Sequence, residues 1–395
     1  MPSAPSVAVI GAGVVGASVA RSLAASGASV TVFERDRLGA GTSSTTFAWI
    51  NSNGKSPDSY HALNVAGMRE HEELQAATVT EAHWLVRTGT YEWATDPAKI
   101  ERLEARTRRL VGLGYPVEMV TAKELVTRIP ELHVHPRSSD IVGFPSESYV
   151  WSSVLMARLW SEARSHGAVL RAPVDVLDVV EQPDGVRLEL STGETWSGDY
   201  VVSAAGRWSE QVMSMLGLPF AMIDPDLPNK FACGFLGSTD PQYVQLASNL
   251  ITPELNVRPD GAGRLLLQTP DLDDRADPAH EPDTDGLIGR EMLARLRRLF
   301  DNTDRARIER IRVGQRARPA DGLPAVGFVT PAARLYLIAT HSGITLAPLL
   351  GRLVAEELVA GERSPLLADY APDRLVGRTI ADFPKFATLH FPAQQ

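Results

Sequence analysis

The stretch VAVIGAGVVGASVARSLAASGASVTVFER, residues 7–35, decides the fold. A short run of β-branched residues leads into the glycine-rich segment GAGVVG at 11–16. An apolar pattern with helical spacing follows, and a second β-branched run ends at Glu34. Strand, glycine turn, helix, strand and acid in this order are typical of a dinucleotide-binding unit. We therefore predict a Rossmann-like unit at this end of the chain.

Each glycine of this turn has a physical role in such a unit. Gly11 allows a tight turn, Gly13 lets the backbone approach a pyrophosphate, and Gly16 lets the helix pack closely on the strand. The helix that opens at Val14 and Val15 presents free N–H groups and the positive end of its dipole to the phosphates. These residues are therefore expected to hold a dinucleotide.

The second strand ends in Glu34, with Arg35 next to it. A carboxylate at this point accepts hydrogen bonds from ribose hydroxyls. We expect both residues at the cofactor site. This half of the pattern does not separate NAD from FAD.

Composition excludes several other classes of protein. The chain has 395 residues, of which 44% are hydrophobic and 22% charged, values that are ordinary for a globular protein and not for a disordered chain, a coiled coil or a collagen. A net charge of −9 argues against nucleic acid as a partner. With Cys233 as the one cysteine, no internal disulfide or cysteine-based metal site is expected. His133 and His135 form an H-x-H without an evident third ligand, so no metal is predicted.

Targeting signals are not evident. No apolar run approaches the ~20 residues that a membrane-spanning helix needs. The first residues carry no basic side chain before the glycine motif, which is unlike a signal peptide. We expect a cytoplasmic protein with no membrane span.

The other end of the chain contains a second set of motifs. A strand is predicted at 335–340, followed by HSGITLAPLLGRLVAEELVAG at 341–361, a glycine turn that opens an amphipathic helix. The segment GQRARPADGLPAVG lies upstream at 314–327.

With these motifs the sequence resembles the D-amino-acid oxidase/glycine oxidase/sarcosine oxidase family of FAD-dependent amine oxidoreductases. The resemblance rests on GAGVVG with Glu34, on the two C-terminal motifs, on VVSAAGRWS at 201–209 and on 143–170. It chiefly covers the FAD-binding parts.

The resemblance implies FAD as the cofactor. It is expected to bind non-covalently, because Cys233 is not at the C-terminal position where some relatives attach the flavin. The further residues that the resemblance places along FAD are Thr42, Ser43, Thr46, Phe47, Ala48, Val174, Ala205, Gly206, Trp208, Arg316, His341, Ser342, Gly343, Ile344, Thr345 and Leu346.

The implied fold class is α/β: a Rossmann-like FAD-binding domain interleaved with a smaller α+β substrate domain that has a mainly antiparallel sheet. We expect the FAD-binding domain to comprise 1–85, 145–225 and 310–395. The substrate domain is expected at 86–144 and 226–309, with one crossing in the proline-rich segment 219–228.

Two arginines are candidates for the substrate carboxylate at the motif 314–327. Aligned without gaps, the family pattern places Arg316 there, and a guanidinium fork matches a carboxylate. Ala317 replaces the usual proline, and an Arg-Pro pair follows at Arg318, so Arg318 stays open as an alternative. An ordinary surface ion pair is the other reading of either arginine.

Other polar residues are weaker candidates. Arg258 lies in a predicted hairpin at 255–268, either as a substrate contact or on a solvated strand face. Asn51, with the neighbouring Asn53, Lys55, Tyr60 and His61, lies beside an expected apolar ring. His341 is expected to hydrogen-bond the flavin or simply to bond backbone. The acid-rich stretch 271–277 is interpreted as a solvated loop, with a lid as the alternative.

The predicted function is oxidation of the C–N bond of an amino acid or N-substituted amino acid to the imine, by hydride transfer to flavin N5. Oxygen or another acceptor would take the electrons. The alternatives are a flavin-dependent dehydrogenase of a 2-hydroxy acid or other carboxylate, and a non-catalytic flavin-binding subunit. The residues expected to act on substrate are Arg316, His341, Arg258 and Asn51. Nothing in the sequence predicts the oligomeric state.

Overall fold

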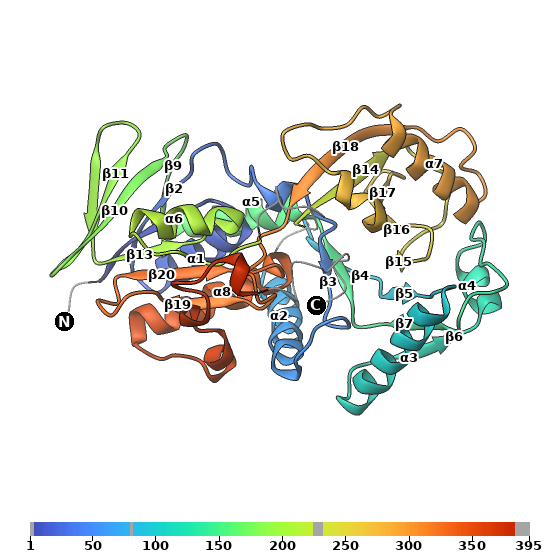
Figure 1. The fold of residues 1–395 in the computed structure, drawn as a ribbon, viewed down its shortest axis with the longest axis horizontal. Helices are drawn as coiled ribbons and strands as arrows, with labels where there is room; N and C mark the ends of the chain where they lie inside the picture. Colours follow the sequence, from blue (N-terminus) through green and yellow to red (C-terminus); the bar gives the residue numbers. More distant parts are fainter. Residues whose placement is uncertain (1–3, 80–81, 224–231, 384–395) are drawn as a thin grey trace.

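The computed structural model describes residues 4–79, 82–223 and 232–383. Two large sheets organise these residues, and their elements lie on opposite sides of the molecule in Figure 1. Helix α2 (Asp58–Ala76) and the small sheet formed by β3 (Trp49–Ile50), β8 (Ser148–Val150) and β4 (Leu85–Arg87) lie between them.

The first sheet has six strands and is mainly parallel. Its order is β19 (Ala325–Phe328), β20 (Leu335–Ala339), β13 (Tyr200–Ser203), β1 (Ser6–Ile10), β2 (Ser29–Phe33) and β9 (Val169–Arg171). Strand β19 alone runs antiparallel to its neighbour. Continuous runs such as Val7–Val9 suit this sheet because both of its faces are covered.

Helices and a smaller sheet cover those two faces. On one face α1 (Val14–Ala25) and α8 (Gly343–Ala355) pack against the sheet and each other, with α5 (Ser152–Ser165) beside α1. On the other face lie α6 (Ser209–Met215) and the antiparallel sheet of β10 (Val176–Gln182), β11 (Gly185–Leu190) and β12 (Thr195–Gly198).

The second sheet has eight strands and is mainly antiparallel. Its order is β18 (Ile308–Gln315), β14 (Cys233–Thr239), β17 (Leu265–Gln268), β16 (Asn256–Pro259), β15 (Asn249–Ile251), β5 (Thr90–Glu92), β7 (Ile141–Phe144) and β6 (Glu118–Val120). Only β15 and β5 pair in parallel. Helices α4 (Ala122–Arg128) and α7 (Leu287–Leu299) contribute to its core, and α3 (Pro97–Gly112) lies near β5 to β7.

This architecture confirms the predicted fold class, a Rossmann-like α/β part with a mainly antiparallel second sheet. The two sheets draw on alternating parts of the chain, as the colours in Figure 1 show. The expected change of domain at 309–310 falls inside β18, which continues to Gln315 in the second sheet. Part of the crossing expected at 219–228 lies outside the described residues.

The acid-rich stretch 271–277 corrects an expectation. It is not a solvated loop over its first half, because Pro270–Arg275 forms a 3-10 helix, here called η3. Asp273 within it is only 2% exposed. Its carboxylate accepts hydrogen bonds from the Phe235 N–H in β14 and from the side chain of Arg316, directly after β18, which explains why an acid is buried there.

Two expected absences concern only the described part of the chain. None of its helices is long and apolar enough to cross a membrane. Within the same residues no three His, Cys, Asp or Glu side chains gather as a metal site would require.

Candidate active site

One continuous cavity of about 810 Å³ runs from the glycine turn to the second sheet. This main cavity takes its walls from the β1–α1 turn, the segment 40–55, the ends of β13 and β20, and the start of α8. Its far wall comes from β5, α3, β15 to β17 and η3. Its volume is in the upper part of the range for ligand pockets.

The glycine turn is closed so tightly that side chains would collide in it. Gly11 has φ +100°, and a Cβ there would lie 2.8 Å from the carbonyl oxygen of Ala204. A Cβ on Gly16 would collide with the carbonyl of Gly11. Gly16 therefore allows the helix to close against the turn and does not itself line the cavity.

The first turn of α1 is left open toward the cavity. Gly13 is the N-cap and supplies no side chain, and no acidic residue lies in the first turn. The Val14 N–H donates to Ser43 Oγ at 2.9 Å, which ties the segment 41–44 to the turn. The positive end of the helix dipole, with no acidic residue to oppose it, suits a pyrophosphate at this point.

Glu34 is held at the edge of the same turn. Its carboxylate accepts hydrogen bonds from the N–H groups of Ala12 and Asp36, both at 2.9 Å. Its carbonyl accepts from the Val174 N–H at 2.8 Å, which brings the start of the β10 segment to this end of the cavity. The Arg35 guanidinium lies 4.0 Å over the Trp208 ring.

The opposite end of the cavity contains the start of α8. Its first turn has no acidic residue and no side-chain cap, and Ser342 Oγ instead bonds the Tyr60 hydroxyl at 2.7 Å. Burial lowers the pKa of His341 well below its ordinary value, and Lys55, Arg318 and Arg316 lower it further. His341 is therefore a neutral imidazole at neutral pH.

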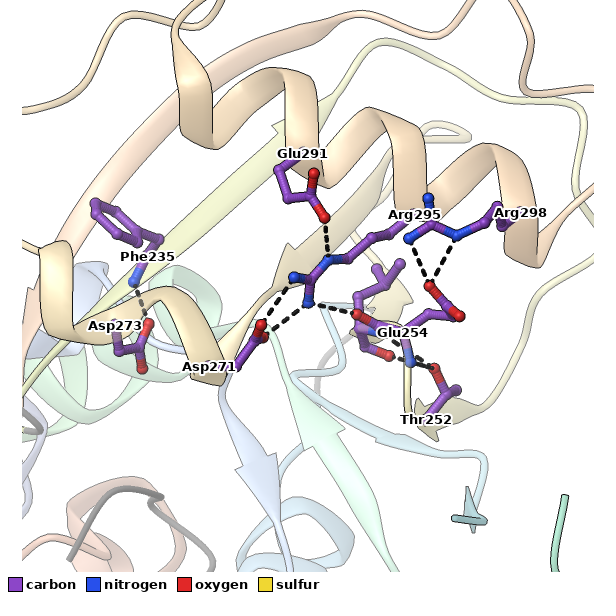
Figure 2. A network of polar contacts seen from close by, with 9 residues as sticks. Phe235, Thr252, Glu254, Asp271, Asp273, Glu291, Arg295 and Arg298 are labelled. Atoms are coloured by element: carbon purple, nitrogen blue, oxygen red, sulfur yellow. Dashed lines mark hydrogen bonds and ion pairs between the residues drawn. The ribbon is translucent and has the colours of Figure 1, made fainter. Parts of the chain in front are cut away.

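Arg316 lines the cavity as predicted, and it is anchored from behind. Its Nη2 donates to Asp273 Oδ2 at 2.7 Å, and its Nη1 donates to the carbonyl of Cys233. Asp273 also accepts from the Phe235 N–H at 3.0 Å (Figure 2). A Cβ on Gly234 would collide with this pair, so the glycine makes room for it. The guanidinium is thus fixed at the cavity wall.

Arg258 lies elsewhere, because it does not line the main cavity. Its guanidinium donates to the carbonyls of Phe47 and Pro259 and lies 4.9 Å from the Tyr149 ring centroid. Burial lowers its pKa to about 10. With 4% exposure it is not on a solvated strand face either. These contacts fit a structural role under the loop that precedes β3.

The polar set after β3 divides into two groups. Asn51, Asn53 and Lys55 line the cavity, whereas His61 bonds Ser52 Oγ at 2.9 Å away from it. Tyr60 bonds Ser342 and is not part of the lining.

A buried acid that the sequence did not reveal organises this set. Glu147 is fully buried and accepts from Trp49 Nε1 at 2.9 Å, Asn53 Nδ2 at 3.3 Å and the Tyr115 hydroxyl at 2.9 Å. Burial raises its pKa to about 7. A single acid in GFPSESYVW carries no local signal, because its partners lie far away in the sequence.

Most predicted cofactor residues line the main cavity. Those that do are Gly11, Gly13, Val14, Val15, Glu34, Arg35, Thr42, Ser43, Thr46, Phe47, Ala48, Val174, Ala205, Gly206, Trp208, Arg316, His341, Ser342, Gly343, Ile344 and Thr345. Gly16 and Leu346 do not, and Leu346 is fully buried in the core. The wall from β5 and α3, including Trp93 and Arg106, was not predicted.

Comparison with known proteins identifies the family of the chain. Residues 6–357 match the family described as DAO, FAD dependent oxidoreductase. The chain belongs to this family.

Two curated members and a solved structure are similar over nearly the whole chain. Glycine oxidase of Geobacillus kaustophilus (strain HTA426) is 27% identical over 385 residues, 94% of this chain and 97% of that protein. Glycine oxidase of Bacillus subtilis (strain 168) is 23% identical over 365 residues, 90% of this chain and 93% of that protein. The crystal structure of glycine oxidase from Geobacillus kaustophilus has a TM-score of 0.79 at 24% identity, covering 93% of this chain and 98% of that one.

This DAO-family chain is thus an enzyme of the FAD-dependent amino acid oxidase and dehydrogenase class. The residues present fit the cofactor. A side chain at Gly11 would collide with the carbonyl of Ala204, the first turn of α1 has no acidic residue and no side-chain cap, and Glu34 is fixed beside it.

Proposed function

We propose that the chain oxidises the C–N bond of an amino acid or N-substituted amino acid to the imine. The observation that supports this most is Arg316, a guanidinium anchored by Asp273 on the wall of the cavity that begins at the glycine turn. An amino acid needs such a group for its carboxylate. FAD, when bound non-covalently, supplies the acceptor of the hydride.

The chain's own residues orient the substrate and select which substrate binds. Arg316 holds the substrate carboxylate, so that the αC–H is directed along the cavity toward the start of α8. There His341 and Asn51 offer neutral hydrogen-bonding groups. The open first turn of α8 favours negative charge next to it. The protein contributes orientation and electrostatics more than acid–base chemistry.

The reaction balances as a two-electron oxidation. The αC–H bond breaks and its electron pair leaves as hydride, while the neutral amine nitrogen loses a proton to water as the C=N bond forms. Water then hydrolyses the released imine. Oxygen or another acceptor takes the electrons in the second half of the reaction.

The decisive experiment is anaerobic reduction of the FAD-loaded enzyme by a panel of amino acids, N-methyl amines, N-carboxyalkyl amino acids and 2-hydroxy acids. Bleaching of the visible absorption by amines alone supports the proposal. Bleaching by 2-hydroxy acids alone, or by no compound of the panel, contradicts it.

The role of Arg316 has its own test. Arg316→Ala should raise KM for a carboxylate substrate by about tenfold or more, because a charge-assisted hydrogen bond is lost. An unchanged KM removes Arg316 from this role. Acid precipitation should release the flavin to the supernatant, since Cys233 is fully buried in the core of the second sheet.

A further inference from the structure

The wall of the main cavity contains a buried asparagine whose amide is fixed by Glu147. Asn53 lines the cavity and is only 2% exposed. Its Nδ2 donates to Glu147 Oε2 at 3.3 Å, the same oxygen that accepts from Trp49 Nε1 at 2.9 Å. An indole nitrogen is a donor only, so Oε2 acts as an acceptor. The Asn53 atom that faces it is therefore the amide nitrogen and not the amide oxygen.

A closed ring of hydrogen bonds also holds the backbone that carries this amide. The Ser52 N–H donates to the Tyr115 hydroxyl at 3.3 Å, and this hydroxyl donates to Glu147 Oε1 at 2.9 Å. The Lys55 N–H donates to the carbonyl of Ser52 at 3.2 Å and so closes the turn around Asn53. Both the side chain of Asn53 and its backbone are thus preorganised by contacts to the buried acid.

This network reaches the end of the cavity where α8 begins. The Trp49 carbonyl accepts from Thr345 Oγ1, in the first turn of α8, at 3.4 Å. Trp49 and Thr345 line the main cavity together with Asn53. Under the proposed function the αC–H of the substrate is directed to this end. The amino group is attached to the same carbon, so it arrives there too.

The amide oxygen of Asn53 is open to a ligand. Among the described residues no donor bonds Oδ1, and this oxygen is not sealed within the protein. Nitrogen and oxygen lie on different sides of an amide, so the bond from Nδ2 to Glu147 turns Oδ1 away from that acid. Oδ1 is thus an acceptor at the cavity wall, and an N–H of a ligand would satisfy it.

We propose that Asn53 recognises the amino group of the substrate. Its Oδ1 accepts an N–H of the amine, and Glu147 is the positioning residue that fixes the amide in this orientation. The inference rests on the proposed function for the identity of the ligand. It narrows the substrate class to primary and secondary amines, because a neutral tertiary amine has no N–H to donate.

The test uses two planar carboxylates without an αC–H to transfer, pyrrole-2-carboxylate and 2-furoate. They differ in one ring atom on the carbon that carries the carboxylate, an N–H in the first and an oxygen in the second. Each is titrated into the oxidised, FAD-loaded enzyme, and binding is followed by the change in the visible absorption of the flavin. The unaltered enzyme should bind the pyrrole about five- to tenfold more tightly, as expected from one hydrogen bond.

Three variants and a control assign this preference to its residues. Asn53→Leu should bring the ratio of the two affinities close to one, through weaker binding of the pyrrole. Glu147→Leu should do the same, whereas Glu147→Gln should keep the preference, because its amide oxygen can accept from Trp49 and Asn53. The matched control is Asn256→Leu on the far wall of the cavity, where Nδ2 of Asn256 donates to Gln268 Oε1 at 3.2 Å. It should leave the ratio unchanged.

The unaltered enzyme and Asn53→Leu decide the question even where Glu147→Leu does not fold. A ratio near one in the unaltered enzyme overturns the inference, because Oδ1 then faces water. A preference that survives in Asn53→Leu, or failure of both ligands to bind, also overturns it. If amines bleach the flavin but the ratio is one, the proposed function stands and this inference fails. If no amine bleaches the flavin while the preference depends on Asn53, the opposite holds.

Discussion

At the scale of single residues, the most informative contact is the ion pair of Arg316 and Asp273. Their side chains are 11% and 3% exposed. Breaking such a pair leaves an uncompensated charge in a region shielded from water, whereas removing both partners does not. The pair therefore matters for stability as well as for the proposed carboxylate contact.

Asp273→Asn should reduce the free energy of unfolding by about 3 kcal/mol, because Arg316 loses its buried counter-charge. The double variant Asp273→Asn/Arg316→Gln should recover part of this loss. Chemical denaturation of the FAD-loaded single and double variants measures their free energies of unfolding. The matched control is Asp274→Asn, the exposed neighbour in η3, which should change stability by less than about 0.5 kcal/mol. Additive losses in the double variant would show that the pair is not coupled.

Glu147 predicts a pH dependence of stability. Its pKa in the folded protein is about 7, above its ordinary value of 4.5. Between these two values the folded state binds more protons than the unfolded state, so raising the pH through this window lowers the free energy of unfolding. The shift corresponds to roughly 3 kcal/mol in total.

Glu147→Gln removes this titration. The difference in unfolding free energy between the unaltered enzyme and the variant should therefore shrink as pH rises from the ordinary value of 4.5 to about 7, as measured by urea denaturation across that range. Lys55 does not confuse the result, because its pKa of about 8 places its own change above this window. A difference that stays constant with pH would mean that folding does not raise the pKa of Glu147.

At the scale of elements, η3 connects the second sheet to the cavity. Figure 2 shows Arg295 of α7 bonding both carboxylate oxygens of Asp271 in η3, at 2.7 and 2.8 Å, and the carbonyl of Glu254 at 2.9 Å. The Arg295 Nε also donates to the carboxylate of Glu291, one turn earlier in α7, at 2.9 Å. Since η3 also contains Asp273, α7 helps to fix the cavity wall on which Arg316 lies.

Arg295→Met should loosen η3 without unfolding the chain, because Met keeps much of the side-chain volume and loses every hydrogen bond. Amide hydrogen exchange in peptides that cover 270–276 should speed up, and KM for a carboxylate substrate should rise a few-fold. The matched control, Arg297→Met on the exposed side of the same helix, should leave both unchanged. Faster exchange in α7 alone, with no change at 270–276, would show that Arg295 does not help to hold η3 in place.

At the scale of the whole molecule, local patterns are predictable from the sequence and distant pairings are not. The glycine turn and Glu34 fall within one strand–turn–helix–strand unit, so their spacing alone predicts their roles. Glu147 and Trp49 are 98 positions apart, and Asp273 and Arg316 are 43 apart. No periodicity connects such positions. For this reason the sequence predicts a solvated loop at 271–277 and leaves Arg258 on a strand face, although both lie among partners supplied by other elements.

The main cavity takes its walls from both sheets, so its ligand should stabilise both together. A ligand that binds only the folded state adds about 2.7 kcal/mol at a free concentration roughly one hundred times its Kd. Stripping FAD should therefore lower Tm, and adding FAD back should restore it with a dependence on concentration.

Hydrogen exchange tells where this stabilisation acts. On adding FAD to the stripped protein, amides of the β1–α1 turn, of 340–345 and of β16 and β17 should gain protection at the same FAD concentration, because each contributes to one cavity. NAD⁺ at equal concentration is the control and should protect none of them beyond the glycine turn, since it has a nicotinamide in place of the isoalloxazine ring of FAD. Protection limited to the first sheet would mean that the second sheet does not share the cofactor site.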